Sequence, residues 1–373
     1  MQSQHKPVLI FAQSGRFLAQ SATQAGYRVW VADCFGDQET LIAAERWQQL
    51  PPLSELSSHE LLSLLLMVTQ GEECMLICGS GIESLYSILN QLPSTIQLLG
   101  NSFDTVHAIK TPRLFFKLLA RHKLSVPETV FETPENSVDW LVKSALGMGG
   151  NHIQHLNSAQ SNINPLTYFQ KMIFGSTGSA LFLANGTHSQ LISINKQNVS
   201  EDQHSPFQLG SIETPWLISA QHKKEIESAI NDITLETGLL GLNSLDFIIS
   251  EQGKLYLLEV NPRPSASAEL TKNKAILFQH HINACQGSLP SPSIMQSIDN
   301  ASLYYIYATH DLTIPHNMDW PIECHDRPVP LSLIHKGEPI CTALVSVKNK
   351  ESAKELHSYI EQKLFKQLSP LGT

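Results

Sequence analysis

One stretch decides the fold of this chain: Gly241–Ser267, which reads GLNSLDFIISEQGKLYLLEVNPRPSAS. The runs Leu245–Ser250 and Lys254–Val260 are apolar, β-branched or aromatic-rich, as in strands. Gln252-Gly253 between them is typical of a tight turn. The stretch therefore predicts a β-hairpin with a two-residue turn. Because side chains alternate between the faces of a strand, we expect one face to carry Leu255, Leu257, Glu259 and Asn261.

Two carboxylates of this hairpin are expected to face each other. If Glu251 pairs with Lys254 across the turn, Asp246 falls opposite Glu259, with Cβ atoms about 4.5–5.5 Å apart. Carboxylates at that separation repel each other, and Asn261 adds an amide oxygen two residues further on. Such an oxygen-only ligand set suits magnesium that also holds phosphates. The pattern favours a metal site, and the alternative is that both acids are solvated ends of an edge hairpin.

The end of the second strand, Leu258–Arg263 (LEVNPR), resembles the metal-binding strand of the ATP-grasp superfamily. Members of that family usually activate a carboxylate as an acyl phosphate and couple it to an amine. The resemblance implies that Asp246, Glu259 and Asn261 hold Mg²⁺ on ATP. It also implies a catalytic role for Arg263, in contact with phosphate or the acyl phosphate.

Further motifs follow in the order of that superfamily. Gly100–Ser102, Lys110–Leu119 and Val126–Thr129 resemble the entry to its first ATP-binding lobe, where Lys110 would reach the α- or β-phosphate. Trp140–Lys143 is a short apolar strand that ends in lysine. Because Lys143 supplies a positive charge from a strand, we predict that it binds phosphate and acts in catalysis.

A glycine-rich segment, Gly147-Met148-Gly149-Gly150, follows this strand. Glycine lets backbone N–H groups approach phosphate oxygens without interference from a Cβ atom. We therefore predict that Gly147, Gly149 and Gly150 belong to a mobile loop that closes over the triphosphate. A flexible turn between two strands is the alternative.

The segment Tyr168–Gly175, followed by Ser179–Gly186, resembles the inter-lobe strand and hairpin whose backbone reads adenine. The resemblance implies nucleotide contacts from Gln170, Met172 and Ile173. Many relatives place a glutamate directly after the glutamine. Lys171 stands there in this chain, so the anchoring of ribose or adenine departs from the family pattern.

The composition is that of an ordinary globular enzyme. A length of 373 residues predicts two to four domains, and a formal net charge of −9 leaves no basic footprint for nucleic acid or an anionic membrane. Leu61–Val68, the longest apolar run, is too short to span a bilayer, and we expect no leader peptide. The six cysteines include no C-x-x-C pair, which favours reduced thiols in the cytoplasm. Histidine pairs such as His152 with His155 invite a zinc hypothesis but lack recognised ligand spacing.

Strands and helices alternate in the first hundred residues, which predicts a parallel sheet with crossover helices. A dinucleotide-binding domain with Asp33 on a ribose is a poor alternative, because the first turn reads Gln13-Ser14-Gly15-Arg16 and lacks G-x-G-x-x-G. Gly79–Glu83 begins a helix, whose N-terminal amides are candidates for an anionic substrate group. We expect an α/β N-terminal pre-ATP-grasp domain at 1–100, a first lobe at 101–165, a second lobe with the metal site at 166–290 and a β-rich C-terminal unit at 300–373.

The sequence thus predicts an ATP-grasp carboxylate–amine ligase that uses ATP and Mg²⁺, with small-molecule acid and amine partners; a homodimer stays open. Trp320–Thr342 resembles the C-terminal extension of an ATP-grasp group of methylotrophic bacteria, although Leu331-Ser332 stands where relatives have glycine. Together with a resemblance to archaeal tyramine–glutamate ligases, this implies the biosynthesis of a C1-carrier cofactor of methanofuran or tetrahydromethanopterin type. A non-catalytic ATP-binding protein with a retained fold and a dinucleotide-dependent oxidoreductase are the rival hypotheses.

Overall fold

The N-terminal alternation of strands and helices builds a five-stranded parallel sheet in the order β3-β2-β1-β4-β5. Its central strands are buried along nearly their whole length, since helices cover both faces of such a sheet. The computed structural model describes residues 6–150, 152–156, 166–200, 205–291, 300–346 and 350–368. The elements of this domain are β1 (Val8–Ala12), α1 (Arg16–Gln24), β2 (Val29–Asp33), α2 (Gln38–Ala43), β3 (Arg46–Gln49), α3 (Ser58–Thr69), β4 (Cys74–Cys78), α4 (Ile82–Leu85) and β5 (Ile96–Leu98).

The described part of the first lobe contains two helices and a four-stranded antiparallel sheet in the order β6-β9-β7-β8. The expected boundary after residue 165 is too early, because the last of these strands in the chain pairs with both β7 and β6 and carries the lobe to Lys171. The elements are α5 (Phe103–Lys110), α6 (Pro112–Arg121), β6 (Thr129–Val130), β7 (Trp140–Ser144), β8 (Gln154–His155) and β9 (Thr167–Lys171).

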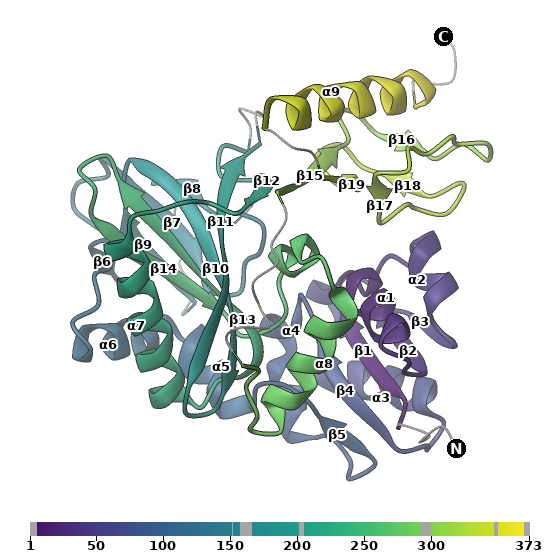
Figure 1. Cartoon of the computed structure of the whole chain (residues 1–373), viewed down its shortest axis with the longest axis horizontal. Helices are drawn as coiled ribbons and strands as arrows, with labels where there is room; N and C mark the ends of the chain where they lie inside the picture. Colours follow the sequence, from purple (N-terminus) through teal and green to yellow (C-terminus); the bar gives the residue numbers. More distant parts are fainter. Residues whose placement is uncertain are drawn as a thin grey trace.

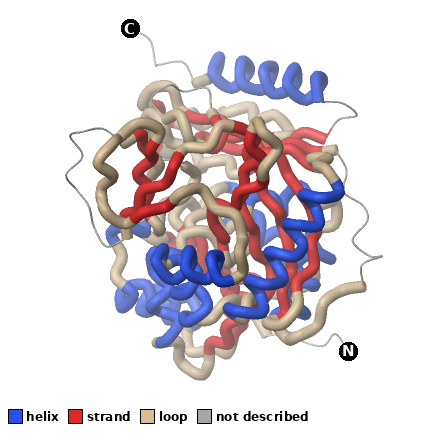
Figure 2. Tube along the Cα trace, turned by 90° about the vertical axis from the view of Figure 1, so that its left-hand side faces the viewer, coloured by secondary structure: helices blue, strands red, loops and turns tan. Residues whose placement is uncertain are grey.

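A large antiparallel sheet in the order β14-β13-β10-β11-β12-β15-β19-β17 forms the middle of the molecule, with helices outside it (Figures 1 and 2). One face is covered by α5, α6 and α7, and Ile226, Ile230 and Ile233 of α7 pack there against Phe182 and Phe247. The elements from the second lobe are β10 (Gly175–Asn185), β11 (Ser189–Val199), β12 (Leu209–Thr214), α7 (Ala220–Thr237), β13 (Leu240–Ser250), β14 (Leu255–Asn261), the 3-10 turn η3 (Ala266–Leu270) and α8 (Lys274–Cys285).

The C-terminal strands extend this same sheet. β12 pairs with β15, which pairs in turn with β19, so the β-rich C-terminal unit continues the second lobe rather than standing as a sheet of its own. Its last helix lies on the outer side of the unit (Figure 1) and closes an apolar core with Ile360 and Leu364. The elements are β15 (Ala301–Tyr307), β16 (Leu312–Thr313), β17 (Cys324–His325), β18 (Leu333–Ile334), β19 (Pro339–Ser346) and α9 (Lys350–Gln367).

Helix α8 joins the N-terminal domain to the large sheet. Phe278 and Ile282 pack into the core of the parallel sheet. Leu277 and Ala284, on another side of the helix, pack against β10 and β13 residues of the large sheet. A helix buried on two sides fixes the parallel sheet relative to the second lobe, between which it is seen in Figure 1.

The β13–β14 hairpin is confirmed, but its details differ from the expectation. Ile249 pairs with Leu255 and the Ser250 amide donates to the Lys254 carbonyl at 2.9 Å, so the turn has three residues, Glu251–Gly253. A β-bulge at Leu258 then shifts the register back by one residue. Because the bulge reverses the alternation, Leu257 and Val260 share the buried core, and the expected common face of Leu257 with Glu259 is wrong.

Candidate functional site

The three predicted metal-binding residues meet at the β13–β14 edge of the large sheet. Asp246 pairs directly with Glu259, and the Asn261 side-chain amide donates to Asp246 Oδ2 at 3.2 Å. Gln197 of β11 donates to Asp246 Oδ1 at 3.3 Å. Two carboxylates and an amide oxygen make a hard donor set that suits Mg²⁺, once the Asn261 amide turns its oxygen inward.

The pKa values of Asp246 and Glu259 are shifted in opposite directions. Burial and the negative charge of Glu259 raise the pKa of Asp246 to about 7. Burial would also raise the pKa of Glu259. The pKa nevertheless lies below its usual value, because Lys110 lowers it, followed in size of effect by His152 and Lys143. The carboxylates of Asp246 and Glu259 therefore repel each other at this point of the sheet unless a cation binds between them. This arrangement is typical of a cation site.

Two predicted phosphate-binding lysines flank this pair. Lys110, at the end of α5, lies 3.5 Å from Glu259 Oε2. Lys143 of β7 is buried and donates to Gln170 Oε1 at 2.7 Å. Burial lowers the pKa of Lys143 although Glu259 and Asp246 act to raise it. Lysines from α5 and β7 thus lie beside two acids of the large sheet, so residues from both lobes border one site.

The predicted glycine loop is seated on the second lobe. The Leu209 amide of β12 donates to the Gly149 carbonyl at 2.9 Å. A Cβ atom at Gly150, where φ is +84°, would lie 1.8 Å from the Phe207 carbonyl oxygen. Only glycine permits this approach of two backbones, so the loop reaches from the first lobe to the second.

His152 is a residue of this site that the sequence did not assign to it. Its ring packs against Gly147, where a Cβ atom would lie 1.8 Å from the ring. Burial lowers the pKa of His152, while the Glu259 carboxylate acts to raise it, so the ring is within electrostatic reach of Glu259. His155 is exposed and contacts Phe207 instead, so the two histidines form no common site. Only the position of His152, two residues after the glycine loop, could have suggested this.

The inter-lobe segment partly fits the predicted adenine contacts. Gln170 faces the site through its bond to Lys143, but the Met172 amide already donates to the Asp139 carbonyl at 2.7 Å. Its carbonyl and Ile173 are left as the candidates for adenine. Lys171 points the other way: its ammonium donates to the Val138 carbonyl at 2.8 Å and lies over the Trp140 ring. The departure from the family pattern therefore puts no positive charge into the nucleotide site.

Arg263 lies just after β14, the strand that carries Glu259 and Asn261, and pairs with a residue of the N-terminal domain. Its Nε donates to Glu83 Oε1 at 2.7 Å. Glu83 Oε2 also accepts the Gly81 amide at 3.0 Å. The Gly81 amide at the start of α4, where an anionic substrate group was expected, is thus engaged by a carboxylate of the chain itself.

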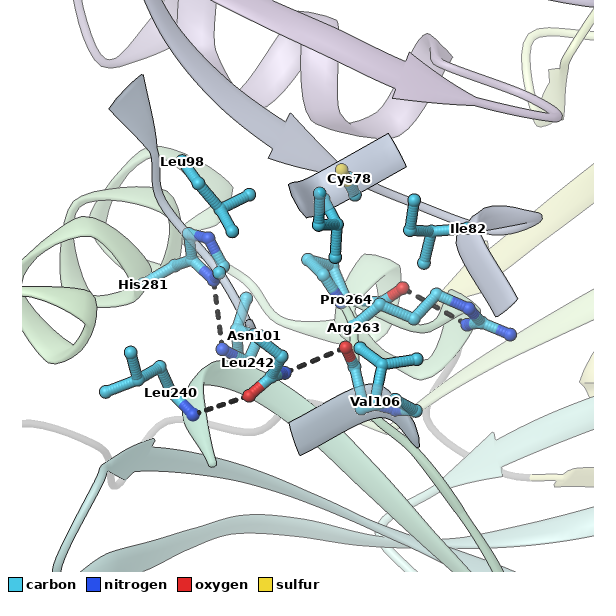
Figure 3. A pocket seen from close by; sticks show the side chains of 13 residues that line it. Cys78, Ile82, Leu98, Asn101, Val106, Leu240, Leu242, Arg263, Pro264 and His281 are labelled. Carbon is cyan, nitrogen blue, oxygen red and sulfur yellow. Dashed lines mark hydrogen bonds between the residues drawn. The ribbon is translucent and has the colours of Figure 1, made fainter. Parts of the chain in front are cut away.

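Asn101 holds the start of the Pro262-Arg263 segment in place. Its side chain donates to the Pro262 carbonyl at 2.8 Å and accepts the Leu240 amide at 2.8 Å (Figure 3). Buried His281 accepts the Leu242 amide on Nδ1 at 2.9 Å in the same pocket. Arg263 lines this pocket, but its guanidinium points away from Asn101 (Figure 3). The motif Gly100–Ser102 therefore has a structural role here.

Asp33, the ribose-binding candidate of the dinucleotide hypothesis, is occupied in the same way. It accepts the Gly15 and Gly36 amides at 2.9 and 3.1 Å and the Trp47 indole at 2.8 Å. Within the described ranges, no group of three or more His, Cys, Asp and Glu side chains could hold a metal ion. No helix in that part of the chain is long and apolar enough to cross a membrane.

Comparison with known proteins agrees with this architecture. Residues 112–267 match the family model of the ATP-grasp domain, which confirms the resemblance, and the chain contains an ATP-grasp domain. Biotin carboxylase from Campylobacter jejuni is a similar solved structure, with 11% identity, a TM-score of 0.73 and coverage of 99% of this chain and 92% of that one.

Two further solved structures resemble the chain over nearly their whole length. N5-carboxyaminoimidazole synthetase from Staphylococcus aureus, complexed with ADP, shares 16% identity at a TM-score of 0.70, covering 95% of this chain and 97% of that one. L-amino acid ligase from Bacillus licheniformis shares 14% identity at a TM-score of 0.69, covering 97% and 98%. No curated protein matches the chain in sequence. These likenesses establish the fold.

Proposed function

We propose that this protein is an ATP-dependent ligase that joins a carboxylate, expected to be that of an amino acid, to an amine. The observation that supports this most is the pairing of Asp246 with Glu259 beside Lys110 and Lys143, in an ATP-grasp domain whose glycine loop is seated on β12. A nucleotide triphosphate needs a cation and lysines on its phosphates together with a cover against water, and this site has residues for each.

The proposed reaction has two steps. A carboxylate oxygen attacks the γ-phosphorus of ATP, the bond to the β,γ-bridging oxygen breaks, and an acyl phosphate and ADP form. The amine nitrogen then attacks the acyl carbon, phosphate leaves with the bonding electrons of the C–O bond, and the nitrogen loses a proton. Lys110, Lys143 and Arg263 neutralise charge during these transfers. The loop at Gly149 and Gly150 excludes water, which would otherwise hydrolyse the acyl phosphate.

Asp246, Glu259 and Asn261 would hold the magnesium ions. Bound there, Mg²⁺ would offset the charge on the β- and γ-phosphates and align them for transfer. Because the described residues supply two carboxylates and one amide at that point, phosphate oxygens and water would complete the coordination shell. The donor set therefore fits a metal that arrives with the nucleotide.

For the substrates and the cellular setting we propose a cytoplasmic ligase of C1-carrier cofactor biosynthesis. The support is the resemblance of Trp320–Thr342 to the methylotroph group and the resemblance of the chain to tyramine–glutamate ligases. One similar structure is itself described as an L-amino acid ligase, which agrees with an amino acid as the acid component. We also propose that the protein forms a homodimer, to be tested together with the ligase activity.

The test is ADP release from ATP and Mg²⁺ with defined acid and amine pairs, beginning with glutamate and tyramine. Release that requires both partners, with an amide product seen by mass spectrometry, supports the ligase. A non-catalytic nucleotide-binding protein would bind MgADP but release no ADP with any pair, and an oxidoreductase would bind NAD instead. Lys171, the departure from the family pattern that would favour a non-catalytic protein, faces away from the site.

A further inference from the structure

One carboxylate of the N-terminal domain reaches the catalytic centre, although no motif marks it. Glu83 lies in the first turn of α4 and its side chain is only 2% exposed. Burial would raise its pKa, but the charges of Arg263 and Lys110 lower it, so Glu83 is ionised at neutral pH. A buried anion is costly unless a cation and hydrogen bonds satisfy it. Glu83 has both, from Arg263 and from the Gly81 amide.

The hydrogen bond to Glu83 determines which nitrogens of the Arg263 guanidinium stay available for other contacts. Nε makes the short bond to Glu83, at 2.7 Å. Among the described residues, the two terminal nitrogens have only long contacts, Nη1 to the Pro264 carbonyl at 3.2 Å and Nη2 to Asn261 Oδ1 at 3.5 Å. Because the guanidinium is planar, holding Nε orients the whole fork. Nη2 is thereby kept beside Asn261, one of the proposed metal ligands.

A second ion pair holds the same segment to the N-terminal domain. Arg16 of α1, which is fully buried, donates to Glu269 of η3 at 2.5 Å and to Asp326 at 2.7 Å. The segment from Arg263 to Glu269 is thus tied to the N-terminal domain at both ends. Of these two ion pairs, only the one with Glu83 is made by Arg263, the arginine that we assign to phosphate. The other is made by Glu269, six positions further along the chain.

We propose that Glu83 is a positioning residue, which holds the guanidinium of Arg263 so that its terminal nitrogens face the phosphoryl group in transfer. The proposal rests on the function proposed above. It gives the N-terminal domain a part in the chemistry. The competing explanation is that the ion pair only joins two domains.

A double-mutant cycle on ADP release separates these explanations. We expect Glu83→Gln to lower kcat about tenfold, since it weakens a charge-assisted hydrogen bond, and to leave KM for ATP unchanged. In the Arg263→Lys background, which has no planar fork to orient, Glu83→Gln should cause no further loss. Losses that add in the double variant, or a raised KM for ATP with unchanged kcat, would overturn the proposal. Glu83→Asp, which keeps the charge but shortens the reach, serves if the glutamine variant does not fold.

A spectroscopic readout tests the contact without any activity. In protein labelled with ¹⁵N-arginine, the Nε–H signal of Arg263 is the one lost in Arg263→Lys, and Glu83→Gln should shift or broaden it. Glu45→Gln is the matched control, because Glu45 pairs with Arg28 on the exposed side of the same domain. An Arg263 signal unchanged in Glu83→Gln overturns the positioning role. If the wild-type protein releases no ADP with any substrate pair, the proposed function fails, and this signal still decides the contact.

Discussion

Asp246 lies directly opposite Glu259 because two irregularities of their hairpin compensate each other. The three-residue turn at Glu251–Gly253 moves the register by one residue, and the bulge at Leu258 moves it back. With the turn alone, Asp246 would face Leu258 and Glu259 would lie on the buried face. The bulge therefore brings the two acids to one face, where a cation can bind both. Bulges are common beside active sites for this reason.

Glu259→Gln should separate the metal role of this residue from its packing. The substitution keeps size but removes a charge, so we expect a folded protein that loses ADP release at least about a hundredfold. Metal-free protein should melt no lower than wild type, because repulsion with Asp246 is relieved, although the 3.5 Å contact with Lys110 is weakened. Retained turnover in a folded Glu259→Gln protein would sink the metal-site hypothesis.

Metal and nucleotide are expected to stabilise the protein together. Since the chain offers two carboxylates and one amide at the site, Mg²⁺ alone should shift the melting temperature little. Mg²⁺ with ADP or a non-hydrolysable ATP analogue should raise it clearly, through binding linkage. Thermal melts with each component alone and combined provide the measurement. An equal shift with NAD and none with adenine nucleotides would contradict the ATP-grasp function.

Arg263→Lys tests the fork of the arginine rather than its charge. Lysine keeps the positive charge but not the planar donors, so we expect MgADP to bind normally while ADP release slows about tenfold or more. The buried Glu83 carboxylate would lose its 2.7 Å partner, so a modest fall in melting temperature is expected too. Full activity in Arg263→Lys would remove Arg263 from the catalytic residues.

The glycine loop offers a matched pair of substitutions. Gly149 and Gly150 both have positive φ, +62° and +84°, so alanine strains either by about 1 kcal/mol. Only at Gly150 does the new Cβ meet the Phe207 carbonyl, whereas nothing lies within 4 Å at Gly149. We expect Gly150→Ala to displace the loop from β12 and weaken stabilisation by MgADP more than Gly149→Ala does. Equal effects would mean that the seating on β12 is unimportant for nucleotide binding.

His281 should make stability depend on pH in a defined window. Burial lowers its pKa to about 4, so the folded protein holds it neutral, and the unfolded chain binds its proton below about pH 6.5. Stability should therefore fall as pH falls from about 6.5 to about 4, when protonation of Nδ1 breaks the bond from the Leu242 amide. His281→Gln should melt lower but with a flatter profile over that window. His188→Gln, at an exposed position, should keep the wild-type profile.

Much of the site could be predicted from local sequence. The strand that carries Lys143 and the parallel N-terminal sheet follow from periodicity and residue type, which act over a few neighbouring residues. The pairing of Asp246 with Glu259 was also predicted, but from a two-residue turn, whereas a three-residue turn and a bulge produce it. The family pattern supplied Lys110 and Arg263 because such a motif keeps its order along the chain. For these residues, the sequence close to them was enough to predict their place in the site.

Other features were decided only when distant segments met. Glu83 lies 180 positions from Arg263 in sequence, and a buried glutamate in a short helix has no local mark of its partner. His152 enters the site because the glycine loop is seated on β12, and Lys171 leaves it because strand alternation turns its side chain to Trp140. The sequence by itself determined which residues could carry charge to a phosphate. Tertiary packing decided which of those charges are buried, paired and oriented, because desolvation and hydrogen-bond geometry exist only once the domains are in contact.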